Sequence, residues 1–356
     1  MIRERVKYLQ ERLEAGEAAL ISSDAGRLYY TGFKSSAGYA AVTADKAVFF
    51  IDFRYYEKAR ETVKSCEVVL LSAFYKQLGD FLSSENVKTV LLETGSVTLE
   101  SYDNYAKRLP GFDFSTDPKL QRIITKQRSV KSSDETALIK KAQAMTDETF
   151  GYILNRIKPG RTEREVMLDM EFYMRGLGSE GVSFDFIVVS GKNSSLPHGV
   201  PTDKKIEAGD FVTMDFGAVS GGYRSDMTRT VAAGGVNDKQ RSVYETVLEA
   251  QKRTIAYIRP GVICRDVDRV ARDYIAGAGY GECFGHGLGH SVGLEIHESP
   301  ACNTVCTDVM ETGMIMTVEP GIYIENEFGV RIEDMVIVTK DGCEDITKSK
   351  KELIIL

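Results

Sequence analysis

The chain has 356 residues, of which 43% are hydrophobic and 27% are charged, and its formal net charge is −7. This composition is typical of a soluble globular protein, and the negative charge argues against nucleic acid as a partner. No apolar run approaches the roughly 18 residues that cross a bilayer, so no membrane association is expected. The length predicts two domains, each able to bury a core.

The N-terminal end and the cysteines indicate a cytoplasmic protein. Residues 1–13 have the pattern of a charged amphipathic helix and lack the apolar core of a signal peptide. The six cysteines are scattered and are interpreted as reduced thiols. Cys302 and Cys306 are close enough in sequence for a metal site, but with no second thiol pair nearby, packing thiols are the favoured interpretation.

Residues 1–125 predict a small α/β domain, because short apolar strands alternate with helical patterns. No phosphate loop or cofactor fingerprint occurs in it. The expected strands cover residues 18–21, 39–42, 47–51, 67–71 and 89–92, and the expected helices cover residues 53–63 and 74–82.

A polar, basic stretch at residues 126–133 is typical of a linker and begins the second domain, residues 126–356. Ser132 and Glu135 then form a capping-box pattern, which predicts a long helix through about residue 157. Thr162 and Glu165 repeat the pattern and predict a second helix after a Pro-Gly break.

The second domain contains an internal repeat with an offset of 101 residues. The run I-K-P-G at 157–160 returns as I-R-P-G at 258–261, R-E-V at 164–166 as R-D-V at 265–267, and G-L-G at 176–178 as G-A-G at 277–279. Three matches in one register predict two related halves, each with helices followed by strands. His198 and His297 fall at nearly matching positions, so the two imidazoles should approach one site from opposite sides.

Two hairpins each place acidic residues across from one another. In the first, a two-residue turn at Ser220-Gly221 would directly oppose Asp215 and Asp226. In the second, a turn centred on Asn326 would oppose Glu319 and Glu333. Facing carboxylates repel, so a cation should lie between them.

The four histidines of the chain are confined to His198 and a twelve-residue stretch holding His286, His290 and His297. His290 lies on the segment between the two acidic hairpins. One imidazole and four carboxylates form an oxygen-rich ligand set that suits two divalent ions, and it favours Mn²⁺ while leaving Co²⁺, Zn²⁺ and Fe²⁺ open. Such ions would lower the pKa of a water that they share, so that it can act as a nucleophile.

The order Asp215, Asp226, His290, Glu319, Glu333 resembles the pita-bread metallopeptidases, the family of creatinase, aminopeptidase P and prolidase. The segments S-D-M-T-R-T, H-x3-H-x6-H-E, V-E-P-G-I-Y and R-I-E-D carry the resemblance. The domain before them is similar to the N-terminal domain of the prolidase and aminopeptidase P branch. The resemblance implies an α/β N-terminal domain followed by an α+β pita-bread catalytic domain with a pseudo-two-fold repeat.

The resemblance also implies residue roles. Asp215 would bind one metal ion, His290 and Glu319 the other, and Asp226 and Glu333 both. Glu319 would also relay a proton, and His198 and His297 would hold the scissile carbonyl and its oxyanion. His286 would line the substrate pocket, and Arg331 would orient the bridging carboxylates.

The activity implied is metal-dependent hydrolysis of the Xaa-Pro bond by a homodimeric exopeptidase. A dipeptidase must bind the free carboxylate after proline, and the stretch from His297 to Glu319, including Ala301, holds no Lys or Arg. This absence favours an aminopeptidase P-like enzyme acting on longer peptides, with Xaa-Pro dipeptidase as the alternative. More remote alternatives are a creatinase-like amidinohydrolase and a metal-free binding protein, which lack the full ligand set.

Overall fold

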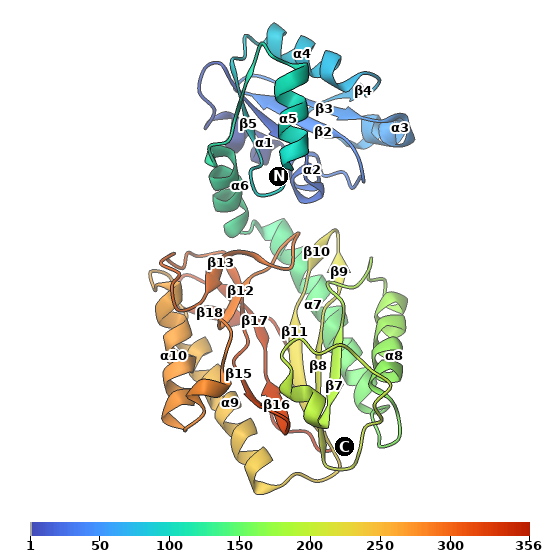
Figure 1. The fold of residues 1–356 in the computed structure, drawn as a ribbon, viewed down its shortest axis with the longest axis vertical. Helices are drawn as coiled ribbons and strands as arrows, with labels where there is room; N and C mark the ends of the chain where they lie inside the picture. The colour runs from blue at the N-terminus through green and yellow to red at the C-terminus, as the bar shows by residue number, and fades with distance from the viewer. Residues whose placement is uncertain (1) are drawn as a thin grey trace. The chain divides into compact units, whose positions relative to one another are not determined.

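The computed structural model describes residues 2–356 and forms two compact units (Figure 1). One unit ends at Arg128 and the other begins at Ser129. The polar stretch predicted as a linker starts inside a helix, α6 (Lys119–Ser129). Basic residues Lys126 and Arg128 in its last turn favour a helix C-terminus, which explains why a charged stretch remains helical.

The first unit is built on a six-stranded mixed sheet in the order β4-β3-β2-β1-β5-β6. All five predicted strands are confirmed, and the structure adds β6. The strands are β1 (Glu17–Ile21), β2 (Tyr39–Thr43), β3 (Ala47–Ile51), β4 (Glu67–Leu70), β5 (Thr89–Leu92) and β6 (Asp113–Ser115). Besides α6, the helices are α1 (Ile2–Gln10), α2 (Asp24–Thr31), α3 (Phe53–Thr62), α4 (Phe74–Ser84) and α5 (Leu99–Arg108).

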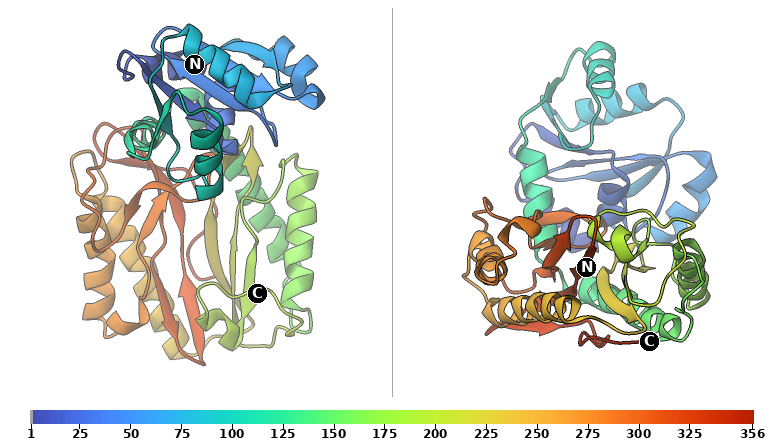
Figure 2. Two further views of the ribbon diagram at one scale, coloured as in Figure 1. Left: turned by 45° about the horizontal axis from the view of Figure 1, so that its top comes forward. Right: turned by 60° about the horizontal axis from the view of Figure 1, so that its bottom comes forward.

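The second unit has two halves, each with a pair of helices beside its own strands (Figures 1 and 2). The first half contains α7 (Ser133–Leu154), α8 (Glu163–Gly176), β7 (Ile187–Ser190), the 3₁₀ turn η1 (Gly191–Ser195), β8 (Asp210–Phe216), β9 (Val219–Ser220), β10 (Tyr223–Arg224) and β11 (Met227–Ala233). Its main sheet has the order β11-β8-β7. Both predicted capping boxes are present, at Ser132 and at Thr162.

The second half contains α9 (Asp238–Tyr257), α10 (Cys264–Gly277), the 3₁₀ turn η2 (Gly281–Cys283), β12 (Gly289–Ser291), β13 (Glu298–Cys302), β14 (Ile315–Val318), β15 (Gly321–Ile324), β16 (Phe328–Arg331), β17 (Asp334–Val338) and β18 (Cys343–Asp345). Its main sheet has the order β13-β12-β14-β17-β18. Helices α8 and α10 start and end 101 residues apart, so the predicted repeat is confirmed in the structure.

An apolar core lies under each helix pair. One buried cluster joins α7 and α8 to the three-stranded sheet, and another joins α9 and α10 to the five-stranded sheet. The strands carrying acidic residues lie between the two helix layers, where both cores support them (Figure 2). No helix in residues 2–356 is long and apolar enough to cross a membrane.

Candidate metal centre

The second acidic hairpin has the predicted register. Gly321 pairs with Arg331 and Val318 pairs with Asp334, which places Glu319 opposite Glu333. Asn326 adopts a left-handed conformation, φ 59°, at the centre of the turn. The two glutamates lie in the gap between the β14–β17 and β15–β16 ladders, so neither belongs to a regular pair.

The first acidic hairpin has a different register from the one predicted. Asp215 pairs with Thr228, and the tight turn is Gly221-Gly222, where both glycines have positive φ. The turn requires two left-handed residues, which Ser220 would resist. Because this shift moves the partner by two residues, Asp226 remains on the face of Asp215 and lies diagonal to it.

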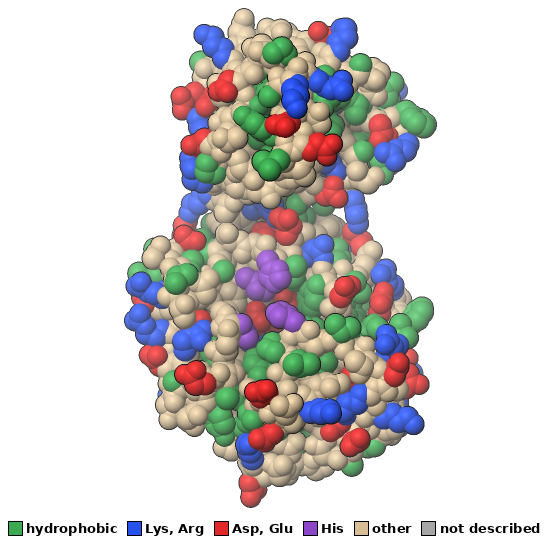
Figure 3. All heavy atoms as spheres, viewed as in Figure 1, with side chains coloured by type: hydrophobic (Ala, Val, Ile, Leu, Met, Phe, Trp, Pro, Cys, Tyr) green, Lys and Arg blue, Asp and Glu red, His purple; other side chains and the backbone are tan. Residues whose placement is uncertain are grey.

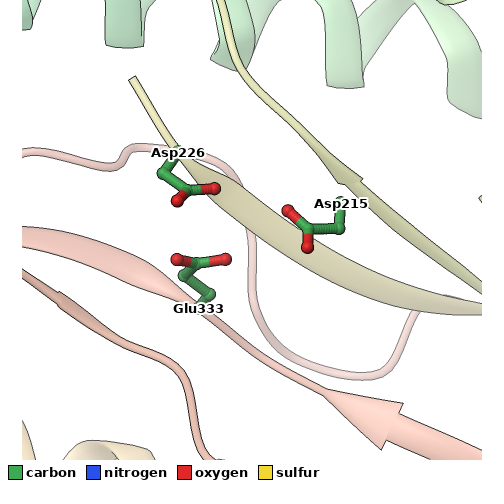
Figure 4. Close-up of side chains that lie close together, drawn as sticks. All are labelled: Asp215, Asp226 and Glu333. Carbon is green, nitrogen blue, oxygen red and sulfur yellow. The ribbon is translucent and has the colours of Figure 1, made fainter. Parts of the chain in front are cut away.

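Three carboxylates meet where the hairpins come together. Ligand oxygens of Asp215, Asp226 and Glu333 lie within 4.8 Å of one another (Figure 4). Asp226 and Glu333 are buried, and burial, followed by the neighbouring carboxylates, raises the pKa of each well above its usual value. Oδ1 of Asp215 and Oε1 of Glu333 are buried without a hydrogen-bond partner. Buried carboxylate oxygens that lack a hydrogen-bond donor fit a site that binds cations.

His290 and Glu319 extend this cluster. Nε2 of His290 lies 3.4 Å from Oε1 of Glu319 and 3.7 Å from Oδ2 of Asp226. Nδ1 of the same ring faces the carbonyl of Ser291 at 3.1 Å and therefore carries the proton. Burial lowers the pKa of His290, so its neutral Nε2 directs a lone pair toward carboxylate oxygens. A cation between them satisfies that arrangement, and without one the Glu319 carboxyl, whose pKa is raised to about 8, can donate to Nε2 instead.

Burial raises the pKa of Glu319 from 4.5 to about 8. The hydroxyl of Thr317 donates to Oε1 of Glu319 at 3.1 Å and also accepts from the backbone N–H of His290 at 2.9 Å. One hydroxyl thus positions both residues. Thr317 lies two residues before Glu319 and shares its face, a signal that the sequence offered and that was missed.

Arg331 connects the acidic cluster to His286. It donates to Oδ2 of Asp215 at 2.6 Å and to the hydroxyl of Tyr323 at 2.8 Å. Tyr323 in turn lies 2.9 Å from Nε2 of His286, whose Nδ1 faces the carbonyl of Gly287. Burial, with a further effect of Arg331, lowers the pKa of His286 to about 4. His286 is therefore neutral and accepts the Tyr323 proton, and its ring is held by two hydrogen bonds.

Thr228 was also missed from the sequence. Its hydroxyl donates to Oε2 of Glu333 at 2.7 Å and accepts from Nε of Arg331 at 3.0 Å. Thr228 therefore connects Arg331 to Glu333 indirectly, while Arg331 binds Asp215 directly. Its position two residues after Asp226 in S-D-M-T-R-T places it on the face of the acidic residues.

All nine predicted site residues line one cavity of about 1040 Å³. His198 follows η1 in the first half, and His297 lies between β12 and β13 in the second, so the two exposed imidazoles come from opposite halves. The rings of His290 and His297 lie 4.5 Å apart between centroids. Figure 3 shows the histidines gathered around acidic atoms in a hollow of the second unit.

Comparison with known proteins places this cavity in a class of metal-dependent hydrolases. Residues 137–340 match metallopeptidase family M24, and residues 5–130 match the Creatinase/Prolidase N-terminal domain. The chain belongs to the M24 metallopeptidase family, and the predicted pita-bread fold with its N-terminal domain is confirmed. Membership in this family implies divalent metal ions.

Relatives match over the full length. A solved Xaa-Pro dipeptidase from Bacillus anthracis is 41% identical, with a TM-score of 0.96 and 100% of both chains covered. A curated Xaa-Pro dipeptidase from Pyrococcus horikoshii is 37% identical over 99% of both chains. A solved X-Pro aminopeptidase from Thermotoga maritima is 34% identical, with a TM-score of 0.91, over 98% of this chain and 100% of that one.

Proposed function

We propose that this protein hydrolyses Xaa-Pro dipeptides, the alternative specificity considered from the sequence. The observation that carries the proposal is full-length similarity to relatives named Xaa-Pro dipeptidase, at 41% and 37% identity. The aminopeptidase P-like specificity, favoured by the missing cation near Ala301, is second, with the X-Pro aminopeptidase relative in its support.

The metal ligands in this proposal are Asp215 for one ion, His290 and Glu319 for the other, and Asp226 and Glu333 for both. The partnerless buried oxygens and the lone pair of His290 support this assignment. Two divalent ions held there would supply Lewis acidity and lower the pKa of a bound water. The four carboxylates and single imidazole favour Mn²⁺, because oxygen donors dominate.

The chain's own groups then handle the proton and the carbonyl. Glu319, with a pKa near neutrality before cations bind, is placed to accept a proton from the attacking water and to deliver it to the departing proline nitrogen. His198 and His297 line the cavity from opposite halves and would donate hydrogen bonds to the carbonyl oxygen as negative charge develops there.

The carboxylate of a dipeptide needs a donor within the cavity. Arg331 already donates to Asp215, Tyr323, Thr228 and the carbonyl of Pro197. His286 is neutral and held by two hydrogen bonds. Arg331 and His286 are therefore engaged, and His198, which lines the same cavity, can bind the carboxylate only if His297 alone holds the carbonyl oxygen.

Kinetics on three related substrates test the proposal. We expect kcat/KM to be highest for Ala-Pro, lower for Ala-Pro-Ala, and lowest for Ala-Pro-amide, which removes the terminal charge. A clear preference for Ala-Pro-Ala would instead establish the aminopeptidase P-like specificity.

Metal analysis of two histidine variants tests the ligand assignment. His290→Ala should bind less metal, whereas His297→Ala should keep its metal and lose turnover. Metal loss in His297→Ala with full retention in His290→Ala would show that the two roles were assigned the wrong way round.

A further inference from the structure

The first half of the second unit clamps its active-site loop with a buried carboxylate. Glu163 is the first residue of α8 and is 0% exposed. Its Oε1 accepts from the N–H of Ser190 at 2.7 Å and from Asn193 at 3.1 Å. Its Oε2 accepts from the hydroxyl of Thr202 at 2.6 Å. These residues flank the loop that carries His198, so the clamp joins α8 to that loop.

The second half repeats the backbone of this clamp. The N–H of Gly160 donates to the carbonyl of Ile206, and that of Gly261 to Met310, both at 2.9 Å. The backbone N–H of Arg164 donates to the carbonyl of Thr202 at 3.1 Å, and that of Arg265 donates to the carbonyl of Cys306 at 3.0 Å. The donors at the start of each helix therefore correspond between the two halves at an offset of 101 residues. The segments that accept these hydrogen bonds correspond at an offset of 104 residues.

By this correspondence, the pair matching Glu163 and Thr202 is Cys264 and Cys306. Cys264 is the first residue of α10 and is 0% exposed, and its backbone N–H donates to the carbonyl of Asp308 at 2.9 Å. The Cys302 thiol has the largest effect on the pKa of Cys264, which it lowers, and the Cys306 thiol lowers it less, so the three thiols are neighbours. The first half thus has the hydrogen bonds of Glu163 at this position, and the second half has a group of three thiols. These thiols lie outside the metal centre.

We propose that Cys264 and Cys306 form a reversible disulfide with low-molecular-weight disulfides as oxidant. This bond would convert the second clamp into a covalent one. Residues Ala301, Cys302 and Asn303 border the cavity, so the bond would hold a segment that forms part of its wall.

The exposure of the thiols sets the order of steps. Cys264 and Cys302 are buried, whereas Cys306 is partly exposed. The Cys306 thiol loses its proton, its thiolate attacks the external disulfide, and the expelled thiolate takes up that proton. The Cys264 thiolate then attacks the Cys306 sulfur of the mixed disulfide and releases the second thiol. Two protein thiols are oxidised and one external disulfide is reduced to two thiols.

Support for Cys264 as the second nucleophile comes from its surroundings. A hydrogen bond from Cys302 lowers the pKa of the Cys264 thiol, although burial opposes this effect. Its place at the start of α10, where no side chain caps the helix, also favours a thiolate.

Thiol counting and peptide mapping of the full-length, metal-loaded protein test the proposal. After equilibration with oxidised glutathione, we expect two of the six thiols to disappear and one internal cross-link to join the peptides containing Cys264 and Cys306. Dithiothreitol should restore both thiols. Cys306→Thr, which copies Thr202 of the first half, should abolish the cross-link without disturbing the fold.

Cys302→Ser and Cys66→Ser are the matched controls and should still form the cross-link. A mapped bond between Cys264 and Cys302 would overturn the assignment. Glutathione attached to Cys306 with no internal bond, or no loss of thiols, would also overturn it.

Discussion

At the scale of single residues, the direction of the hydrogen bonds explains why two carboxylates of the centre lack a positively charged partner. Arg331 donates to Asp215 and Tyr323, and Tyr323 donates to His286. The positive charge of Arg331 is therefore directed at one carboxylate, while Asp226 and Glu333 have no arginine or lysine hydrogen-bonded to them among residues 2–356. The ions must supply the remaining charge, because facing buried carboxylates repel.

The first prediction concerns Glu319→Gln. Glutamine keeps an oxygen donor but cannot relay a proton, so kcat on Ala-Pro should fall by about 10²–10⁴-fold. Metal content and KM should change far less, as measured by elemental analysis and steady-state kinetics.

Glu325→Gln serves as the matched control, because Glu325 is exposed at the turn of the same hairpin. It should retain full activity. An active Glu319→Gln enzyme with normal kcat would assign the proton transfer to another group.

The second prediction concerns pH and the metal-free protein. Since the pKa of Glu319 is 4.5 in ordinary surroundings and about 8 when folded, the folded state binds this proton more tightly than the unfolded chain. The resulting stability is fully present below pH 4.5 and is lost as the pH rises to about 8. We expect the urea midpoint of the chelated protein to fall over this window.

Added Mn²⁺ should raise that midpoint most at the alkaline end, with release of protons. Chelated Glu319→Gln should show a shallower fall, because one titrating group is gone. A midpoint that rises with pH over the same window would contradict the stated direction of the Glu319 shift.

At the scale of elements, the two acidic hairpins show where strand pairing could be predicted. The β14–β17 hairpin was predicted in the observed register because the turn around Asn326 is short and polar between two apolar runs. In the β8–β11 hairpin, three turn residues in a row left the centre ambiguous. The side-chain period of two kept Asp215 and Asp226 on one face despite this error.

The third prediction concerns the Glu163 clamp. Both oxygens of Glu163 accept hydrogen bonds, so in Glu163→Gln the amide NH₂ group would replace one acceptor and point at donors. We expect the free energy of unfolding to fall by about 1.5–3 kcal/mol, the contribution of a hydrogen bond to a charged group. Urea unfolding measures this loss, and kcat/KM should fall as the His198 loop loosens.

Glu165→Gln, two residues along the same helix, is the control. Glu165 closes an exposed capping box with Thr162, a position that glutamine also fills. Its stability and activity should remain close to those of the unchanged protein. Equal losses in both variants would mean that the effect belongs to the helix and not to the loop.

At the scale of the whole molecule, the repeat places the proposed metal ligands of two halves in one cavity. Asp215 and Asp226 come from the first half, and His290, Glu319 and Glu333 from the second. Each half has its own apolar core, so each set of ligands is supported by packing on its own side. Neither half holds the complete set.

The fourth prediction concerns assembly, where the resemblance drawn from the sequence implies a homodimer. Sedimentation equilibrium of the metal-loaded protein at micromolar concentration should give twice the 39.5 kDa of one chain. A single species at 39.5 kDa over the same concentrations would refute the dimer.

The sequence by itself determined the elements whose signals are local or repeated. The sequence alone predicted the capping boxes at Ser132 and Thr162, five of the six strands of the first sheet and the 101-residue repeat. These features follow from neighbouring residues or from a match within the chain. The proposed ligand residues were also named from the sequence, because four carboxylates and one imidazole stand in a recognisable order.

Only the tertiary structure decided which hydroxyl groups hold the proposed ligands. Thr228 and Tyr323 bind partners on other strands, and Thr317 also accepts from the N–H of His290, 27 residues away. The same holds for Cys264, which joins Cys302 and Cys306 only after α10 packs against the segment that follows β13. Such contacts depend on how elements pack, which periodicity and propensity do not encode.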